Sequence, residues 1–163
     1  GEPGMLLIKG VNVMKGYFGQ PEKTAEVLQD GWYRTGDVAK VDEDGFITIT
    51  DRLSRFSKIG GEMVPHIRIE ELLQQASGVA ESVFAVTGIT DEKKGERLAV
   101  LYTLPEGRAR EACDSLSKPE LSLPAIWIPK WADFAKVDAI PVLGTGKMDL
   151  RGIKDLAIAA LSK

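Results

Sequence analysis

The sequence is poor in cysteine and histidine, with one residue of each, Cys113 and His66, among 163 residues. Because one cysteine cannot form an internal disulfide, a disulfide-stabilised fold is excluded, and a reducing, cytoplasmic compartment is expected. We interpret Cys113 as a structural thiol, since most lone cysteines are buried and unreactive. His66 has no Ser, Cys or Asp partner at a useful spacing, so we interpret it as structural as well.

Long hydrophobic runs and an excess of one charge are also missing. The longest apolar runs, such as residues 83–86 and 98–101, have the length of strands and are far shorter than a membrane span. The 21 Lys and Arg residues face 24 Asp and Glu residues, without the basic excess that nucleic-acid binding needs. We therefore expect a globular protein of one domain, or of one domain with part of another. Its start, Gly1–Met5, does not resemble a signal peptide and is expected to lie inside a domain.

Turn residues divide the first 50 residues into short elements. Residues 5–9 and 46–50 are predicted strands, because apolar or alternating side chains lie between turn signals. Pro21 suits the first turn of a helix, which predicts a short helix over residues 21–28. Asp42–Gly45 predicts a hairpin turn; the alternative, a calcium loop, lacks further ligands at regular spacing.

Helices and strands alternate over residues 52–163. The predicted helices cover residues 67–76, 108–116 and 149–161, and the predicted strands cover residues 79–88, 96–104 and 126–128. This order predicts an α+β fold in which helices pack on a three-stranded sheet, with a domain boundary near Asp51–Ser54.

A Gly-rich turn, Gly144–Lys147, displays a lysine just before a predicted helix. A phosphate-binding P-loop would need a glycine and a Ser or Thr where the sequence has Pro141 and Met148, so that interpretation fails. Two interpretations stay open: Lys147 delivers an ammonium group into a neighbouring site, or it is an ordinary surface lysine.

Two further segments have the composition of a nucleotide site. In Trp32–Asp37 a carboxylate follows a glycine turn at the start of a strand, where Asp37 could accept hydrogen bonds from a ribose diol or could merely cap the turn. In Asp51–Gly61 three cations precede two glycines, which let a thin ligand or another chain approach the backbone. The alternative is a basic, solvated linker.

Taken together, these segments resemble the adenylate-forming superfamily of acyl-CoA synthetases, luciferases and peptide-synthetase adenylation domains. The end of the large domain of that superfamily resembles residues 10–17, 31–37 and 44–46. Its hinge and the opening of its small domain resemble residues 51–64 and 69–70. Its catalytic-lysine motif resembles residues 141–147. The resemblance implies that residues 1–50 are the β-rich end of a large adenylation domain. Residues 51–54 are then a hinge, and residues 55–163 are a small, mobile C-terminal domain.

The resemblance also implies an enzyme that joins a fatty acid to AMP, using ATP and Mg²⁺, and then transfers the acyl group to a phosphopantetheine thiol. Asp37 and Arg52 are implied to bind the ribose hydroxyls, and Lys147 to bind the carboxylate and the α-phosphate. The implied wall of the pantetheine path consists of Lys58, Gly60 and Gly61. Ser54 takes the hinge position, where the family usually has Asp or Lys.

Within the superfamily, residues 58–64, 119–124 and 143–147 most resemble the bacterial acyl-acyl carrier protein synthetases, which are also 2-acylglycerophosphoethanolamine acyltransferases. The acceptor is then acyl carrier protein. The alternatives are an acyl-CoA synthetase and a non-catalytic module that docks an acidic carrier protein through Arg52, Arg55 and Lys58. The phosphate loop, the acyl tunnel and any contact with the inner membrane are expected upstream of Gly1. The 163 residues alone are therefore expected to be inactive and to self-associate through residues 1–50.

Overall fold

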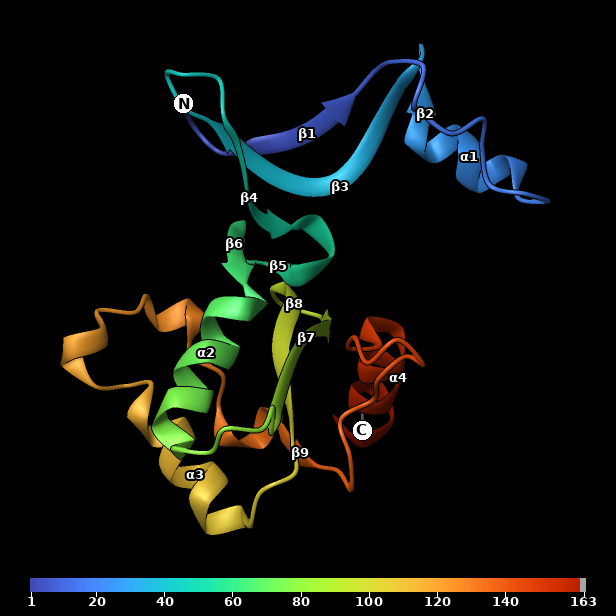
Figure 1. The fold of residues 1–163 in the computed structure, drawn as a ribbon. Helices are drawn as coiled ribbons and strands as arrows, with labels where there is room; N and C mark the ends of the chain where they lie inside the picture. The colour runs from blue at the N-terminus through green and yellow to red at the C-terminus, as the bar shows by residue number, and fades with distance from the viewer. Residues whose placement is uncertain (162–163) are drawn as a thin grey trace. The chain divides into compact units, whose positions relative to one another are not determined.

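A computed structural model describes residues 1–161 of the chain (Figure 1). The chain divides into two compact units, one of Gly1–Ser54 and one that begins at Arg55. Each unit has its own sheet. No helix within residues 1–161 combines the length and the apolar character that crossing a bilayer would require.

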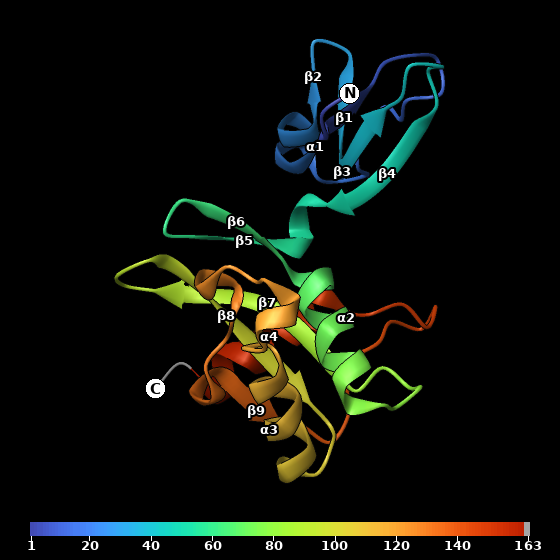
Figure 2. The same ribbon diagram turned by 90° about the vertical axis from the view of Figure 1, so that its left-hand side faces the viewer.

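The first unit is a four-stranded antiparallel sheet with one short helix. Strand β3 is its centre and pairs with all three other strands (Figure 2). The elements are β1 (Gly4–Ile8), α1 (Pro21–Val27), β2 (Leu28–Gln29), β3 (Trp32–Val41) and β4 (Ile47–Arg52). The predicted hairpin turn is confirmed: Asp42 Oδ1 accepts hydrogen bonds from the backbone N–H groups of Asp44 at 3.1 Å and Phe46 at 2.8 Å.

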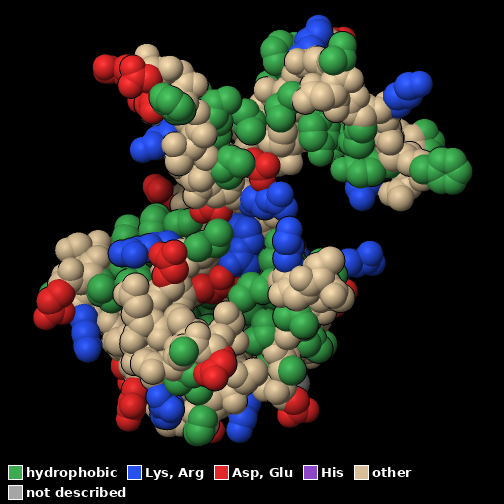
Figure 3. Space-filling model, viewed as in Figure 1, with side chains coloured by type: hydrophobic (Ala, Val, Ile, Leu, Met, Phe, Trp, Pro, Cys, Tyr) green, Lys and Arg blue, Asp and Glu red, His purple; other side chains and the backbone are tan. Residues whose placement is uncertain are grey.

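This first unit buries little of its apolar surface. Ala39 is its one buried residue, whereas Phe46, Ile47 and Ile49 expose 71%, 58% and 59% of their surface. Figure 3 shows hydrophobic side chains on the outside of this unit. Contiguous exposed apolar surface of this kind marks a face that another part of a protein covers.

The second unit contains a five-stranded sheet between two layers of helices. Strand β8 is its centre: it pairs antiparallel with β7 and with the end of β5, and parallel with β9. The strands are β5 (Phe56–Ile59), β6 (Glu62–Pro65), β7 (Phe84–Asp91), β8 (Gly95–Tyr102) and β9 (Phe134–Lys136), and the helices are α2 (His66–Ser77), α3 (Glu106–Ser115) and α4 (Leu150–Leu161).

Helices α2 and α3 cover one face of this sheet and α4 covers the other (Figure 1). The alternation of side chains along the strands sends Val86 and Val100 to the α2–α3 face, and Ala85 and Leu101 to the α4 face. Both faces of the central strands are therefore buried.

The structure confirms the α+β fold class and the three predicted helices of the second unit. Helix α2 ends at Gly78, whose φ of 65° is the left-handed conformation that a C-terminal glycine supplies. Two strands of the predicted three-stranded sheet are present as β7 and β8, and the β5–β6 hairpin, which was not predicted, adds two more. The third strand, however, is Phe134–Lys136 and not residues 126–128. Residues 125–127 form a 3₁₀ turn, because Pro124 precedes them and Pro129, which has no N–H to donate to a sheet, follows.

Candidate functional site

Asp37 and Arg52 lie opposite each other on neighbouring strands of the first unit. The register of β3 and β4 pairs them, and Arg52 Nε donates to Asp37 Oδ1 at 2.7 Å. The side chain of Asp37 is 17% exposed and that of Arg52 is 67% exposed. Asp37 Oδ2 makes no hydrogen bond with another residue in the range 1–161, so it can accept one from a ligand hydroxyl.

The sequence placed Asp37 at the start of a strand, and this was wrong. Asp37 lies inside β3, directly after Gly36, whose φ is 79°. Thr35 Oγ1 accepts a hydrogen bond from Asp37 N–H at 3.0 Å and donates one to the carbonyl of Leu6 at 2.9 Å. These bonds link the bend at Gly36 to β1 and fix the backbone from which the carboxylate projects.

Lys147 lies on a tight turn that begins and ends with an isolated pairing of Val142 and Met148. The backbone N–H of Leu143 donates to the Lys147 carbonyl at 2.7 Å, and Gly146, with a φ of 79°, donates to the Leu143 carbonyl at 2.8 Å. The Lys147 side chain is exposed and makes no ion pair with any residue that the structure describes. The turn therefore presents an ammonium group on an ordered backbone.

Gly60 and Gly61 form the two-residue turn between β5 and β6. Their φ values are 57° and 94°, the combination of a type I′ hairpin turn, which only residues tolerant of positive φ adopt easily. Two glycines between strand-like runs are the sequence signal for such a turn, a signal that the interpretation of this pair as a place of close approach does not use. Lys58 is exposed on β5, and its backbone N–H donates to Glu96 Oε2 at 2.7 Å.

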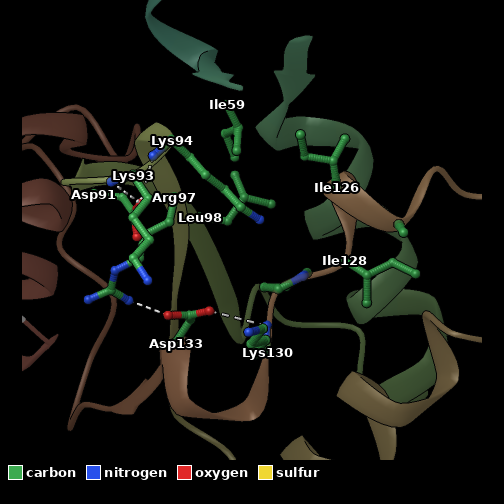
Figure 4. Close-up of a pocket in the computed structure, with 12 residues that line it drawn as sticks. Ile59, Asp91, Lys93, Lys94, Arg97, Leu98, Ile126, Ile128, Lys130 and Asp133 are labelled. Atoms are coloured by element: carbon green, nitrogen blue, oxygen red, sulfur yellow. Dashed lines mark hydrogen bonds and ion pairs between the residues drawn. The ribbon is translucent and has the colours of Figure 1, made fainter. Parts of the chain in front are cut away.

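A cavity of about 380 Å³ lies beside this hairpin (Figure 4). Apolar side chains form part of its wall, and a Cβ placed on Gly60 would lie 3.3 Å from Ile126 Cδ1. Charged side chains form the rest. The apolar lining includes Ile59, Leu98, Ile126 and Ile128, and the charged lining consists of Asp91, Lys93, Lys94, Arg97, Lys130 and Asp133.

Both carboxylates of this cavity are already engaged. Asp91 accepts from the backbone N–H groups of Lys94 and Lys93, at 2.9 and 3.0 Å, and these bonds lower the pKa of its carboxyl group. Asp133 pairs with Arg97 and accepts from Lys130 N–H at 3.2 Å. The ammonium groups of Lys93, Lys94 and Lys130 make no ion pair with another residue among 1–161, so the cavity can bind an anion.

No protein-family model matches the chain. Curated relatives do match it: it is 38% identical over 148 residues to a feruloyl-CoA synthase of Amycolatopsis, covering 91% of this chain and 29% of the relative. It is 35% identical over 149 residues to a long-chain-fatty-acid–CoA ligase of Bacillus subtilis, covering 90% of this chain and 26% of the relative. The chain thus spans less than a third of the length of these relatives.

Solved structures agree with these relatives. ATP-bound MatB from Rhodopseudomonas palustris matches with a TM-score of 0.72 and 28% identity, over 96% of this chain and 30% of that one. The o-succinylbenzoate CoA synthetase of Bacillus subtilis, in complex with its acyl-adenylate intermediate, matches with a TM-score of 0.68 and 30% identity, over 94% of this chain and 31% of that one. The chain belongs to the adenylate-forming superfamily.

Of the site residues predicted from the sequence, the structure brings one pair into direct contact, Asp37 and Arg52. It places Lys147 on an exposed turn, Ser54 in a short 3₁₀ turn, and Gly60 and Gly61 at the tip of a hairpin. No sequence pattern indicated that Lys93, Lys94 and Lys130 share a cavity. They come together only because the β7–β8 turn and the segment before β9 lie on the same side of β5 and β8.

The predicted docking role of Arg55 is wrong. Arg55 is only 7% exposed, and its guanidinium pairs with Glu70 in the interior of the second unit. A buried guanidinium that is already paired with Glu70 is not accessible to an acidic partner. A docking surface of Arg52, Arg55 and Lys58 is therefore not available.

His66 and Cys113 have the structural environments that the sequence suggested. The sequence missed Ser57 as the partner of His66, at 2.8 Å between Oγ and Nε2, but both residues are buried. Burial, together with the charges of Arg55 and Lys154, lowers the pKa of His66 to about 3. Burial raises the pKa of Cys113 to about 11, which disfavours the reactive thiolate.

Proposed function

We propose that this chain is part of an ATP-dependent, AMP-forming acid–thiol ligase. In the first half-reaction a carboxylate oxygen attacks the α-phosphorus of ATP, which gives an acyl adenylate and releases pyrophosphate. In the second, a thiol sulfur attacks the acyl carbon, and AMP leaves. The observation that carries the proposal is the Asp37–Arg52 pair at 2.7 Å, in a chain that is 38% identical to a CoA ligase.

The geometry of the pair suits a ribose. Arg52 occupies Asp37 Oδ1 and so orients the carboxylate, while Oδ2 can accept a hydrogen bond from a sugar hydroxyl. Residues 1–161 contain no cluster of three or more His, Cys, Asp or Glu side chains that could hold the magnesium ion that accompanies ATP. The contribution of these residues is to bind and orient the nucleotide.

Lys147 would act in the first half-reaction only. As carboxylate and phosphate approach each other, their negative charges accumulate, and an ammonium group carried on the turn that the Leu143–Lys147 backbone hydrogen bond orders would stabilise that charge. We place the hinge at residues 51–54, between the end of a large domain at 1–50 and a mobile small domain at 55–163. Rotation there would remove Lys147 before the thiol enters.

Coenzyme A is the acceptor that we favour. Several of the relatives are CoA ligases. In addition, the three lysines of the cavity that make no ion pair lie beside the Gly60–Gly61 turn, an arrangement that suits the narrow pantetheine arm of coenzyme A and the phosphates to which that arm is joined. Acyl carrier protein is the second candidate, because residues 58–64 resemble those of acyl-acyl carrier protein synthetases. The acid is a fatty or aromatic carboxylate, as in the named relatives.

The test uses the full-length protein that contains this chain. Pyrophosphate exchange into ATP, measured with a panel of fatty and aromatic acids, should depend on the acid. Thioester formation should then proceed with coenzyme A and be absent, or far slower, with acyl carrier protein. Exchange without any acid dependence would contradict the ligase, and thioester formed only on the carrier protein would replace coenzyme A as the acceptor.

A further inference from the structure

The residue that follows the proposed hinge has an unusual environment. Arg55 is the first residue of the second unit and is 7% exposed. Its Nη2 donates to Glu70 Oε2, on α2. The other carboxylate oxygen, Glu70 Oε1, accepts from the backbone N–H of Val86, on β7, at 2.7 Å. Three elements therefore meet at one carboxylate: the chain leaving the hinge, a helix and the central sheet.

A buried ion pair is a costly way to join three elements. Removing two charges from water offsets most of their attraction, so an apolar pair of similar size would stabilise the fold at least as well. Here Arg55 Nη1 is also buried without a hydrogen-bond partner among residues 1–161, which adds to the cost. What charged hydrogen bonds add over apolar contacts is direction, because a guanidinium and a carboxylate are planar and accept few relative orientations.

The direction matters because of what lies next in the chain. Strand β5 begins one residue after Arg55 and leads, through Lys58, to the Gly60–Gly61 turn beside the cavity. Strand β5 pairs with β8 only at its end, through Ile59 and Gly95, and its start pairs only with β6, so other contacts must hold that start against the centre of the sheet. The Arg55–Glu70 pair supplies such a contact.

We propose that Arg55 and Glu70 are positioning residues for the thiol half-reaction. They fix the first strand after the hinge to α2 and β7, so that a rotation at residues 51–54 moves the β5–β6 hairpin as a rigid part of the second unit. The step that needs the hairpin is thioester formation, and this inference rests on the proposed function.

The test variant is Arg55→Met with Glu70→Gln. It leaves no buried charge unpaired, and the glutamine still offers an acceptor to Val86 N–H, so the fold should survive. The matched control is Arg68→Met with Glu71→Gln, an exposed ion pair at 3.7 Å on the same helix, with side chains 48% and 56% exposed. Single Arg55→Lys, which keeps the charge but loses the planar fork, should have an intermediate effect.

Two measurements separate this inference from the proposed function. In the 163-residue chain, amide hydrogen exchange over residues 56–59 should be about tenfold faster in the test variant than in the control. In the full-length enzyme, thioester formation from supplied acyl adenylate should fall about tenfold, while adenylation changes less than about threefold. Unchanged exchange, or an equal loss in both half-reactions, would overturn the positioning role. An enzyme that forms no acyl adenylate even unaltered would refute the proposed function instead, whatever the exchange shows.

Discussion

At the scale of single residues, Asp37 and Lys147 differ in how much the structure constrains them. Asp37 is held by a bond to Arg52 and by a backbone that Thr35 links to β1. Lys147 has an ordered backbone and a side chain without a partner among the described residues. A carboxylate that is held in place suits ground-state binding of a nucleotide, and an ammonium group that is not committed to an ion pair is available to a charge that develops in only one step.

Asp37→Ala should weaken ATP binding by the full-length enzyme by about 1.5–3 kcal/mol, roughly ten- to a hundredfold in Kd, because the charge-assisted hydrogen bond from the ribose to Oδ2 is lost and Arg52 loses its partner. Isothermal titration measures the affinity. Asp44→Ala, on the β3–β4 turn, removes an exposed carboxylate of the same sheet and should have no effect. Equal ATP affinities for wild type and Asp37→Ala would reject the ribose assignment.

Lys147→Ala should lower adenylation by about three orders of magnitude, because a preorganised charge opposite the transition state is lost. Thioester formation from supplied acyl adenylate should be nearly unchanged. Rapid-quench measurement of each half-reaction checks this, with Lys118→Ala as an exposed control. If both half-reactions fell together, Lys147 would not be specific for adenylation.

His66 should make the second unit sensitive to acid. Its folded-state pKa is about 3, below the ordinary 6.5, so between these values the unfolded chain binds a proton that the folded chain does not. The free energy of unfolding should therefore fall as the pH drops below 6.5, by up to about 1.4 kcal/mol per pH unit. Urea unfolding of wild type and His66→Gln at pH 7, 6 and 5 isolates this contribution. A wild-type-minus-variant difference that is constant with pH would show that His66 does not cause the loss.

At the scale of elements, the sequence predicted the individual helices and strands well, but it predicted poorly which of them contact one another. The apolar spacing of α2 and its terminating glycine were sufficient to predict this helix and its end, because both depend only on residues that are close together in the sequence. The β propensity of residues 126–128, flanked by Pro124 and Pro129, predicts the third strand there, but the prolines favour a 3₁₀ turn, and the strand lies at Phe134–Lys136. The partners Ser57–His66 and Arg55–Glu70 are 9 and 15 residues apart and depend on how β5 meets α2, which no local pattern encodes.

Gly88, on β7, tests the close packing of β5 around the Ser57–His66 pair. A Cβ at this position of β7 would lie 2.0 Å from Ser57 Oγ, so Gly88→Ala should displace Ser57 from His66 and destabilise the fold by about 1–3 kcal/mol. Ser57→Gly in the same chain should restore part of that loss. Gly107→Ala is the control, because nothing lies within 4 Å of its Cβ position in α3 and alanine favours a helix. Chemical denaturation measures all four proteins, and a Gly88→Ala chain as stable as wild type would contradict the close approach.

At the scale of the whole molecule, the two units differ in how much apolar surface they bury. The second has a core on both faces of its sheet, whereas the first leaves β4 largely uncovered. In longer relatives, of which this chain spans less than a third, more chain is available to cover such a face.

The 163-residue chain alone should therefore associate in a concentration-dependent way through β4. Ile47→Thr with Ile49→Thr should weaken the association about tenfold or more, because these side chains lie on one face of β4, 58% and 59% exposed, and roughly 1–2 kcal/mol of apolar burial is lost at each position. Leu156→Ser on α4, where the leucine is 41% exposed, should leave it unchanged. Sedimentation velocity over a range of concentrations distinguishes these outcomes; a wild-type chain that stays monomeric throughout would show that the face does not self-associate.

The parallel pairing of β9 with β8 has a consequence for the order of folding. Strands β7 and β8 are joined by the short turn 92–94, so their ends meet at little entropic cost, and α2 directly precedes them in the chain. Strand β9 can join only after residues 103–133, with α3 among them, have crossed over the sheet. We therefore expect the α2 face of the hairpin to be covered early and the α4 face late. Until β9 and α4 arrive, Ala99 and Leu101 face water, and the incomplete chain is most prone to aggregate through that second face.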